Sequence, residues 1–310
     1  MMPASDPQPF TPDARALRFS ERLLGGLLRM LPVRHGRHLV LSHLDRLVRL
    51  GGKGWVEVPF GESSLVVDSG DLVGRHFALL RDYDPHVCDV LVAAAGGDES
   101  GVLWDIGANQ GACSYQMLAC VPGVKVVAIE PQAELVALLN HNLSRLSPGK
   151  YETYCVGLGL QNEQLTLTIE EGNRGHASLY ETDVNKASTS EVVEIVTPGE
   201  VLGQSRLGPP SLIKIDVEGY ESVVLSALGE HLAQWHTRAV VFESHLEGRP
   251  KFAAIVESLE AAGYDLYRIT KTITKTLLYP LASADQPATD FVALRRGLDH
   301  SDALRRMMRS

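Results

Sequence analysis

The stretch 102–111, VLWDIGANQG, decides the fold of this 310-residue chain. An apolar run leads into a turn in which Gly107, Asn109 and Gly111 stand at every second position. A second apolar run follows and ends in an acid, Glu130. A buried strand, a glycine turn, a helix and a second strand that ends in an acid form a βαβ unit typical of nucleoside-binding sites. The glycines let the backbone pass close to a ligand where a Cβ would collide.

Two classes of cofactor fit this unit. Dinucleotide enzymes use G-x-G-x-x-G, in which the third glycine and the helix N-terminus receive a pyrophosphate. Here the spacing is G-x-N-x-G, and Ala112 stands in the third position of that fingerprint. S-adenosylmethionine carries no phosphate, so an Asn in the turn is compatible with it. The turn therefore favours the methyl donor, with an NAD-dependent oxidoreductase as one alternative and a noncatalytic S-adenosylmethionine-binding scaffold protein as another.

The composition is that of an ordinary soluble globular protein, 45% hydrophobic and 22% charged, with a formal net charge of −9. This acidic balance argues against nucleic acid as a partner. No apolar run of 18 residues occurs, so we expect no transmembrane segment. The first residues lack a basic start and an apolar stretch, and the four cysteines form no C-x-x-C pair. These features predict a cytoplasmic protein.

Charge is unevenly distributed along the chain. Residues 1–50 hold eight Arg and four acids, whereas the remainder holds 21 basic and 34 acidic residues. Within 14–50, leucines recur at three- and four-residue steps with arginines between them, which predicts basic amphipathic helices. We favour packing of this segment on its own domain or across a homodimer; peripheral membrane contact is the alternative.

Downstream, apolar strand patterns alternate with helical ones. This alternation predicts an α/β fold with a mostly parallel sheet and helices on both faces. Residues 55–68 read as a hairpin, and 264–270 with 291–295 as a closing antiparallel pair joined by a loop at 271–290. The predicted domains are an N-terminal helical and hairpin extension at 1–75, a catalytic domain at 76–298 and a tail at 299–310.

A second motif, LIKIDVEGYESVVL, begins at Leu212. It predicts a buried strand that ends at Asp216, with Glu218 and a tight turn at Gly219 just beyond. Ligands of open α/β sheets bind outside the carboxyl ends of the strands. Three further acids end strands at the same predicted edge: Asp105, Glu130 and Glu243. Their joint placement with the glycine turn predicts a functional site there.

The segments DIGANQG, AIEP and IKIDVEGYE, in this order, resemble the FkbM family of S-adenosylmethionine-dependent methyltransferases. The resemblance spans roughly 83–294, and IKIDVEG-x-E is its most specific part. It implies a class I, Rossmann-like seven-stranded sheet and O-methylation of a hydroxyl on a sugar, glycan or secondary metabolite. A segment of the polar insert, GNRGHASL, is also similar to the family. Leu146 departs from the family, which often has an Asn there, and the first 70 residues match no motif.

These patterns assign roles to residues. Asp105 and the glycine turn should hold the methionine end of the donor, Glu130 the ribose hydroxyls, and residues near Val156 the adenine. The predicted donor-binding set is Asp105, Gly107, Asn109, Gly111, Ser114, Glu130, Val156, Gly157 and Asp216.

The acceptor side is predicted from residue types. His245 is the expected proton acceptor for a bound hydroxyl, because an alcohol benefits from a base. The predicted catalytic set is His245, Asp216, Glu218 and Glu243, and the predicted substrate contacts are Asn173, His176 and Ser178. Some of these oxygen and imidazole groups could ligate a divalent metal, which we do not expect to be needed. Specificity should lie in 1–75, 170–191 and 271–290.

Overall fold

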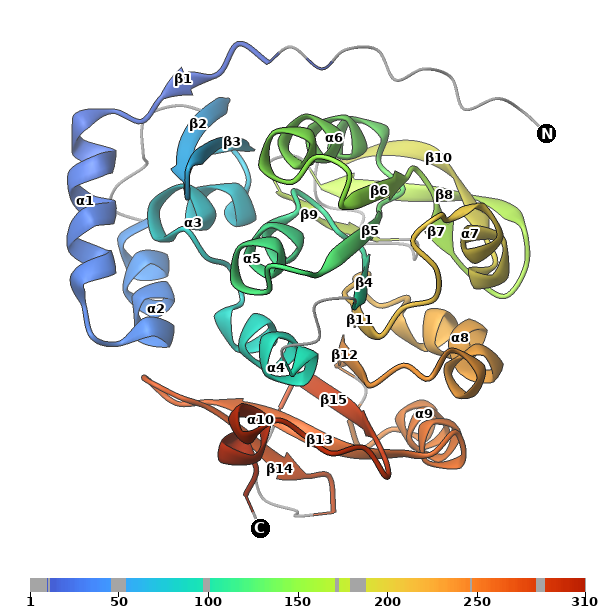
Figure 1. The fold of residues 1–310 in the computed structure, drawn as a ribbon. Coiled ribbons are helices and arrows are strands. Elements are labelled where there is room, and N and C mark those ends of the chain that lie inside the picture. The colour runs from blue at the N-terminus through green and yellow to red at the C-terminus, as the bar shows by residue number, and fades with distance from the viewer. Residues whose placement is uncertain are drawn as a thin grey trace.

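The computed structural model describes residues 10, 12–45, 54–96, 101–170, 173–178, 188–245, 247–282 and 288–309. Its centre is an eight-stranded sheet in the order β14-β13-β15-β12-β11-β4-β5-β6 (Figure 1). The strands are β4 (Val102–Ile106), β5 (Lys125–Ile129), β6 (Tyr151–Tyr154), β11 (Leu212–Ile215), β12 (Ala239–Glu243), β13 (Tyr264–Lys271), β14 (Thr276–Pro280) and β15 (Asp290–Arg295).

The strand order confirms the predicted Rossmann-like fold class. Strands β6, β5, β4, β11 and β12 are parallel, and β15 lies antiparallel between β12 and β13. The predicted closing pair is therefore present. The prediction of seven strands and of a loop at 271–290 was wrong, because β14 forms within that segment and pairs with β13.

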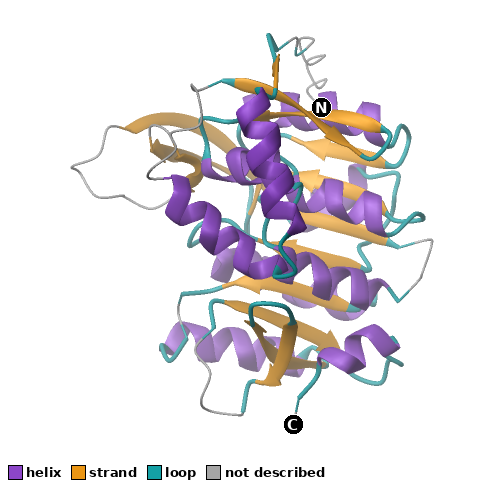
Figure 2. Cartoon of the chain, turned by 90° about the vertical axis from the view of Figure 1, so that its left-hand side faces the viewer, coloured by secondary structure: helices purple, strands orange, loops and turns teal. Residues whose placement is uncertain are grey.

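Helices cover both faces of the sheet (Figure 2). One face packs against α4 (Pro85–Ala95), α5 (Ala112–Cys120) and α6 (Ala133–Leu146). The other packs against α8 (Glu221–Trp235) and α9 (Pro250–Ala261), with α7 (Pro198–Gln204) beside α8. Alternation along β4 places Leu103 in the first apolar layer and Trp104 and Ile106 in the second. Five buried residues in a row make β4 typical of a strand covered on both faces.

The predicted N-terminal extension contains β1 (Arg15–Ala16), α1 (Phe19–Met30), α2 (Arg34–Asp45), β2 (Trp55–Phe60), β3 (Ser63–Asp68) and the start of α3 (Leu72–Leu80), which continues past the predicted boundary at residue 75. The predicted hairpin is confirmed as the antiparallel pair β2–β3. Helix α1 packs on this same domain, where Leu28 joins Leu41, Leu79 and Leu80 in one apolar cluster.

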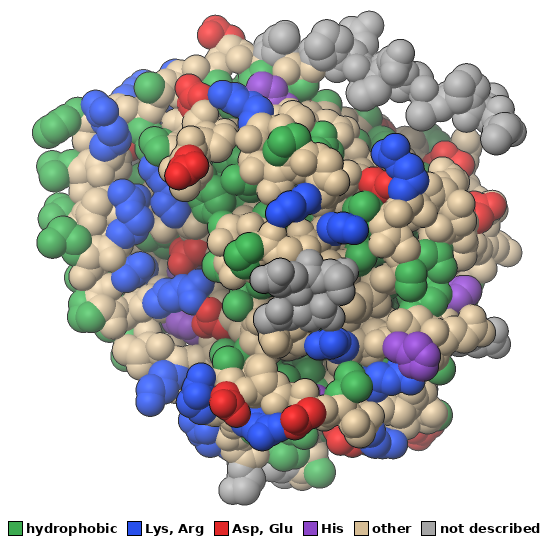
Figure 3. All heavy atoms as spheres, in the orientation of Figure 1, with side chains coloured by type: hydrophobic (Ala, Val, Ile, Leu, Met, Phe, Trp, Pro, Cys, Tyr) green, Lys and Arg blue, Asp and Glu red, His purple; other side chains and the backbone are tan. Residues whose placement is uncertain are grey.

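The opposite side of α1 carries exposed apolar residues. Phe19, Leu23, Leu27 and Met30 are more than half exposed. Hydrophobic side chains protrude beside Lys and Arg side chains at the left edge of Figure 3, where Figure 1 draws α1. The predicted peripheral membrane contact or homodimer would depend on this face, and both stay predictions. No helix in the described residues is long and apolar enough to cross a membrane.

A second, four-stranded sheet lies beside the first, in the order β7-β10-β8-β9. Its strands are β7 (Gly157–Leu158), β8 (Glu163–Glu170), β9 (Asn173–Ser178) and β10 (Ser188–Val196). Strand β9 lies near α3 and holds the backbone of the predicted substrate residues Asn173, His176 and Ser178. Their side chains are outside the described part of the structure, so these contacts stay predictions. Helix α10 (Asp302–Met307) occupies the predicted tail and packs on α4 through the buried Leu304.

Candidate active site

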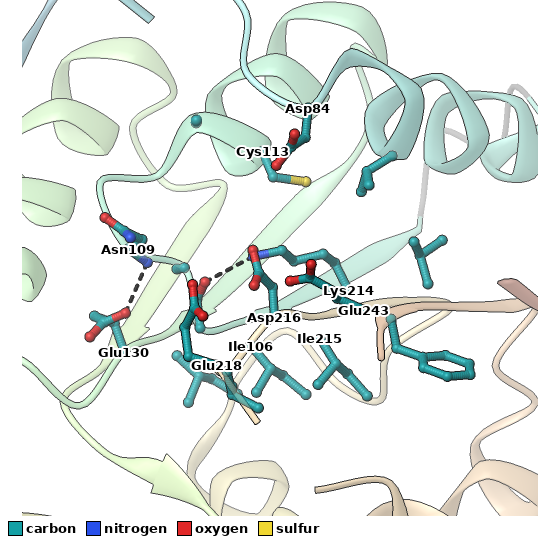
Figure 4. A pocket seen from close by; sticks show the side chains of 18 of the residues that line it. Asp84, Ile106, Asn109, Cys113, Glu130, Lys214, Ile215, Asp216, Glu218 and Glu243 are labelled. Atoms are coloured by element: carbon teal, nitrogen blue, oxygen red, sulfur yellow. Dashed lines mark hydrogen bonds and ion pairs between the residues drawn. The ribbon is translucent and has the colours of Figure 1, made fainter. Parts of the chain in front are cut away.

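A cavity of about 300 Å³ lies at the carboxyl ends of β4, β5, β11 and β12 (Figure 4). This is the edge at which open α/β sheets bind ligands. Nine residues of the predicted donor and catalytic sets line it: Gly107, Asn109, Glu130, Val156, Gly157, Asp216, Glu218, Glu243 and His245. The structure therefore brings together most of the residues that the two motifs indicated.

The glycine turn passes close to the end of β11. Gly107 has φ +71°, and a Cβ there would overlap the carbonyl oxygen of Asp216. Asn109 is also left-handed, with φ +52°, as are Asp84 and Glu218, with φ +43° and +49°. All four line the cavity. Such backbone strain in side-chain-bearing residues concentrates at functional sites.

Gln110 ties the turn to the N-terminal extension. Its side-chain oxygen accepts a hydrogen bond from the Asp68 backbone N–H at 2.8 Å, and its amide donates to the Asp71 carboxylate at 3.0 Å. Asp71 itself caps the first turn of α3. Gln110 is 1% exposed, so this link between two distant segments is shielded from water.

Glu130 closes the other side of the turn. Its carboxylate accepts hydrogen bonds from the backbone N–H of Asn109 at 2.9 Å (Figure 4) and from that of Gln132 at 3.0 Å. Burial raises the pKa of Glu130 to about 7, although those two hydrogen bonds and Lys214 oppose the shift. A buried carboxylate with spare acceptor capacity, at the end of β5, is suited to accept the two hydroxyls of a ribose.

Lys214 is a central residue that the sequence interpretation missed. It lies in β11, is 8% exposed, and its Nζ donates to the Gly107 carbonyl at 2.9 Å. The same Nζ lies 3.4 Å from Asp105 Oδ1 and 3.3 Å from Asp216 Oδ2. Burial lowers the pKa of Lys214, but the two carboxylates outweigh it and the net direction is upward. The sequence did contain one indication of this role, namely a lysine inside the otherwise apolar LIKI strand.

Asp105 points away from the cavity. It is 0% exposed, is not among the lining residues, and its Oδ2 accepts from the Ser114 backbone N–H at 3.1 Å and from Ser114 Oγ at 2.6 Å. Asp105 therefore caps the start of α5 and balances Lys214. Its predicted role at the methionine end of the donor, directly or through water, stays a prediction.

Two further residues of the predicted donor set do not line the cavity. A Cβ at Gly111 would collide with the Tyr115 ring and Leu139, so this glycine allows close packing of the turn. Ser114 is fully buried and is engaged with Asp105. Both support the turn from behind rather than forming its ligand-facing surface.

The polar lining is dominated by carboxylates, which form an acidic wall. Asp84, Asp216, Glu218, Glu243 and Asp290 all line the cavity. Figure 4 shows Asp84 beside Cys113, across from Glu218 and Glu243. Burial raises the pKa of Glu243 to about 8, and the neighbouring carboxylates, first Asp216 and then Asp290, add to the shift. This negative field suits a cationic ligand such as a sulfonium nucleoside.

His245 occupies the rim of the cavity. Its side chain is 71% exposed, and its Nε2 lies 3.2 Å from Glu243 Oε1. Its expected role as proton acceptor stays a prediction. Among the described residues, no group of three or more His, Cys, Asp or Glu side chains is arranged to hold a metal ion.

Several lining residues come from segments without a motif. Tyr83 and His86 flank the start of α4, and Lys271 ends β13. His86 was not predicted, since a histidine near the start of a helix has no distinctive spacing. The apolar part of the wall includes Ile106, Ile129 and Leu158. Together with the glycine turn and Glu130, these side chains give the cavity an apolar wall with polar groups at one side, as small-molecule sites commonly have.

Comparisons with known proteins agree with this geometry. Residues 105–266 match the Methyltransferase FkbM domain family. The hexuronic acid methyltransferase AglP of Haloferax volcanii is 26% identical over 206 residues, which are 65% of this chain and 73% of that protein.

Solved structures of methyltransferases are more distant. Magnesium protoporphyrin IX methyltransferase from Synechocystis, with bound S-adenosylmethionine, is 12% identical at a TM-score of 0.39, over 87% of this chain and 96% of that one. An O-methyltransferase from Bacillus cereus, in complex with S-adenosylhomocysteine, is 11% identical at a TM-score of 0.37, over 70% and 84%. The fold assignment rests on the strand order of this chain itself.

Proposed function

This chain belongs to the FkbM methyltransferase family, and we propose that it methylates a hydroxyl group of a sugar acid. It is an S-adenosylmethionine-dependent methyltransferase. The observation that carries the proposal is the cavity in which the glycine turn, Glu130 and the acidic wall meet at the strand ends. The hexuronic acid methyltransferase that aligns over 65% of the chain supports the choice of acceptor class. The NAD-dependent alternative is not favoured.

The protein's main contribution to methyl transfer is alignment. S-adenosylmethionine supplies, when bound, a methyl carbon attached to a positively charged sulfur. Glu130 would hold the ribose hydroxyls, and the backbone of the 107–109 turn would lie against the donor. Fixing two reactants in line removes on the order of 7–11 kcal/mol of barrier in the best cases.

The acidic wall has an electrostatic role in this proposal. Asp216, Glu218 and Glu243 would stabilise the cationic donor in the ground state and exclude a phosphate-bearing nucleotide by like-charge repulsion. After methyl transfer the sulfur is neutral, so the electrostatic attraction between these carboxylates and the bound nucleoside is weaker. This favours release of the product.

Donor binding is expected to release protons at pH 7.5. Glu243 has a pKa of about 8 in the free protein, so most of its population is protonated at that pH. A nearby sulfonium favours the ionised carboxylate, lowers the pKa and expels the proton. Titration calorimetry in phosphate and in Tris measures the release from the difference in observed enthalpy.

Two comparisons sharpen this test. S-adenosylhomocysteine lacks the sulfonium charge and should release fewer protons than S-adenosylmethionine. Glu243→Gln should reduce the release by the donor while leaving donor binding measurable. Equal enthalpies in the two buffers for S-adenosylmethionine would contradict the assigned coupling.

The acceptor class is tested with labelled donor. The protein is incubated with methyl-labelled S-adenosylmethionine and either glucuronic acid oligosaccharides or matched glucose oligosaccharides. We expect label in the acidic sugar, and retention of that label after mild alkali identifies a methyl ether on a hydroxyl. Label lost to alkali would identify a methyl ester on the carboxylate and would overturn O-methylation of a hydroxyl.

A further inference from the structure

A second cavity, of about 340 Å³, lies between α2, α3, the start of α4 and the turn that joins β13 to β14. Its volume falls in the range of small-molecule sites. It adjoins the first cavity, because five residues line both: Leu72, Tyr83, Asp84, His86 and Lys271. The motifs do not account for it.

This second cavity, the histidine-lined cavity, differs in its chemistry from the first one, the donor cavity in which we place S-adenosylmethionine. Four imidazoles and one lysine line it: His35, His38, His76, His86 and Lys271. Asp84, at the boundary, is its only lining carboxylate within the described part of the chain, and burial raises the pKa of Asp84 above its ordinary value. The donor cavity is acidic, whereas this one presents cationic and proton-donating groups. It therefore suits an anionic, hydroxyl-rich ligand rather than a second cation.

Carboxylates behind the wall hold the imidazoles in place. His38 Nε2 lies 3.0 Å from Asp82 Oδ1, and His35 Nε2 lies 3.5 Å from Asp89 Oδ2. His35 is 7% exposed, and its Nδ1 is buried without a hydrogen-bond partner among the described residues. Buried polar atoms are usually satisfied, so this wall residue is short of one hydrogen-bond partner.

His86 lies at the junction of the two cavities. It is 2% exposed, and its Nε2 is 3.1 Å from Asp290 Oδ2. Burial raises the pKa of Asp290, but the hydrogen bond from His86 and the positive charge of Lys271 oppose it, so the pKa is lowered and the carboxylate is ionised at neutral pH. An ionised carboxylate only accepts hydrogen bonds, so Nε2 carries the proton and Nδ1 of a neutral His86 keeps its lone pair.

We propose that the histidine-lined cavity binds the acidic sugar acceptor and that His86, oriented by Asp290, takes the proton of its reacting hydroxyl. Lys271 and the imidazoles of α2 would face the sugar carboxylate. The hydroxyl oxygen forms its bond to the methyl carbon as the carbon–sulfur bond breaks, with that electron pair remaining on sulfur. The hydroxyl proton ends on Nδ1 of His86. This proposal rests on the proposed function for its acceptor class.

The binding half is tested by filling the cavity from its mouth. Ser42 is an exposed lining residue of α2, whereas its neighbour His43 is exposed and does not line the cavity. With the protein saturated by S-adenosylhomocysteine, Ser42→Trp should weaken binding of a glucuronic acid disaccharide at least about tenfold, and His43→Trp should not. Both variants should bind S-adenosylhomocysteine as the wild type does.

The outcomes separate the two proposals. Unchanged disaccharide binding by Ser42→Trp, beside a functional donor site, would overturn the cavity assignment alone. A wild-type protein that binds donor but neither binds nor methylates any acidic sugar would refute the proposed acceptor class, and with it this assignment. Stronger binding of the matched glucose disaccharide would also contradict an anion-selective wall.

The catalytic half is tested at His86. A general base contributes about 10²–10⁴ in rate, so His86→Gln should lower kcat by at least about 100-fold with donor affinity retained. His86→Ala should regain part of its rate with added imidazole, which a structural role would not produce. Asp290→Asn should cause a smaller loss, since the ring keeps its place but loses its ionised partner.

His245 is the rival base. If His245→Gln loses at least 100-fold in kcat while His86→Gln stays near the wild-type rate, the assignment of His86 is wrong. If His86→Gln does not fold, as judged by lost donor binding, the imidazole rescue of His86→Ala and the kcat of Asp290→Asn decide the question. Absence of both effects overturns the proposal.

Discussion

Replacing Lys214 with methionine is expected to lower the free energy of unfolding by about 3–5 kcal/mol, the usual cost of leaving a buried charge without its partner. Lys214 donates to the Gly107 carbonyl and lies within 3.4 Å of Asp105 and Asp216. Methionine has a similar length, so packing changes little while the positive charge is lost. Asp105, at 0% exposure, would remain as an uncompensated carboxylate.

Urea or guanidinium unfolding measures this loss, and two variants control for it. Lys125→Met, at the half-buried start of β5, should change stability by no more than about 0.5 kcal/mol. The double variant Lys214→Met with Asp105→Asn should recover part of the loss, because it removes both charges and keeps an oxygen to accept from Ser114. A double variant no more stable than the single one would show that charge compensation is not the cause.

Glu130→Ala is expected to weaken binding of S-adenosylhomocysteine by about 10–100-fold, since a hydrogen bond to a charged group contributes about 1.5–3 kcal/mol. In the structure, the Glu130 carboxylate lies at the end of β5 in the cavity wall. The substitution also removes the acceptor for the Asn109 and Gln132 N–H groups, so a smaller loss of stability should accompany it. The loss of affinity should exceed what the loss of stability explains.

Calorimetry with ligand fragments identifies which part of the donor Glu130 contacts. Adenosine contains the ribose hydroxyls and should lose affinity for Glu130→Ala, whereas methionine should not. Glu134→Ala, on the exposed side of the first turn of α6, is the matched control. Unchanged affinity for S-adenosylhomocysteine in Glu130→Ala would reject the ribose role.

The central strands could be predicted because they are covered on both faces. Such strands need largely apolar runs, and 102–106, 125–129 and 212–215 have them, each with a single charged residue: Asp105, Lys125 and Lys214. β14 (TLLYP) was missed because it is only five residues long, ends in a proline and lies at the edge of the sheet, where it pairs with β13. Local pattern alone carries no information about that partner.

Site residues could be predicted where they directly follow a strand. They could not be predicted where their role depends on the face of the sheet to which the side chain points. Glu130 and Asp216 line the cavity, as their positions indicated. Asp105 does not, because alternation along β4 places it on the same face as Leu103, toward α5. His86 and Lys271 come from segments that tertiary packing alone brings to the strand ends, so no spacing in the sequence could have grouped them.

The hydrogen bonds of Gln110 have a consequence for how the chain unfolds. They join the turn between β3 and α3 to the residue that follows Asn109, inside a shielded contact. Opening of the extension would remove two hydrogen-bond partners from the glycine turn, which we propose contacts the donor, so the two regions should lose hydrogen-exchange protection together. A ligand seated on that loop should slow exchange in β3 and α3 as well, although neither element carries a recognisable motif.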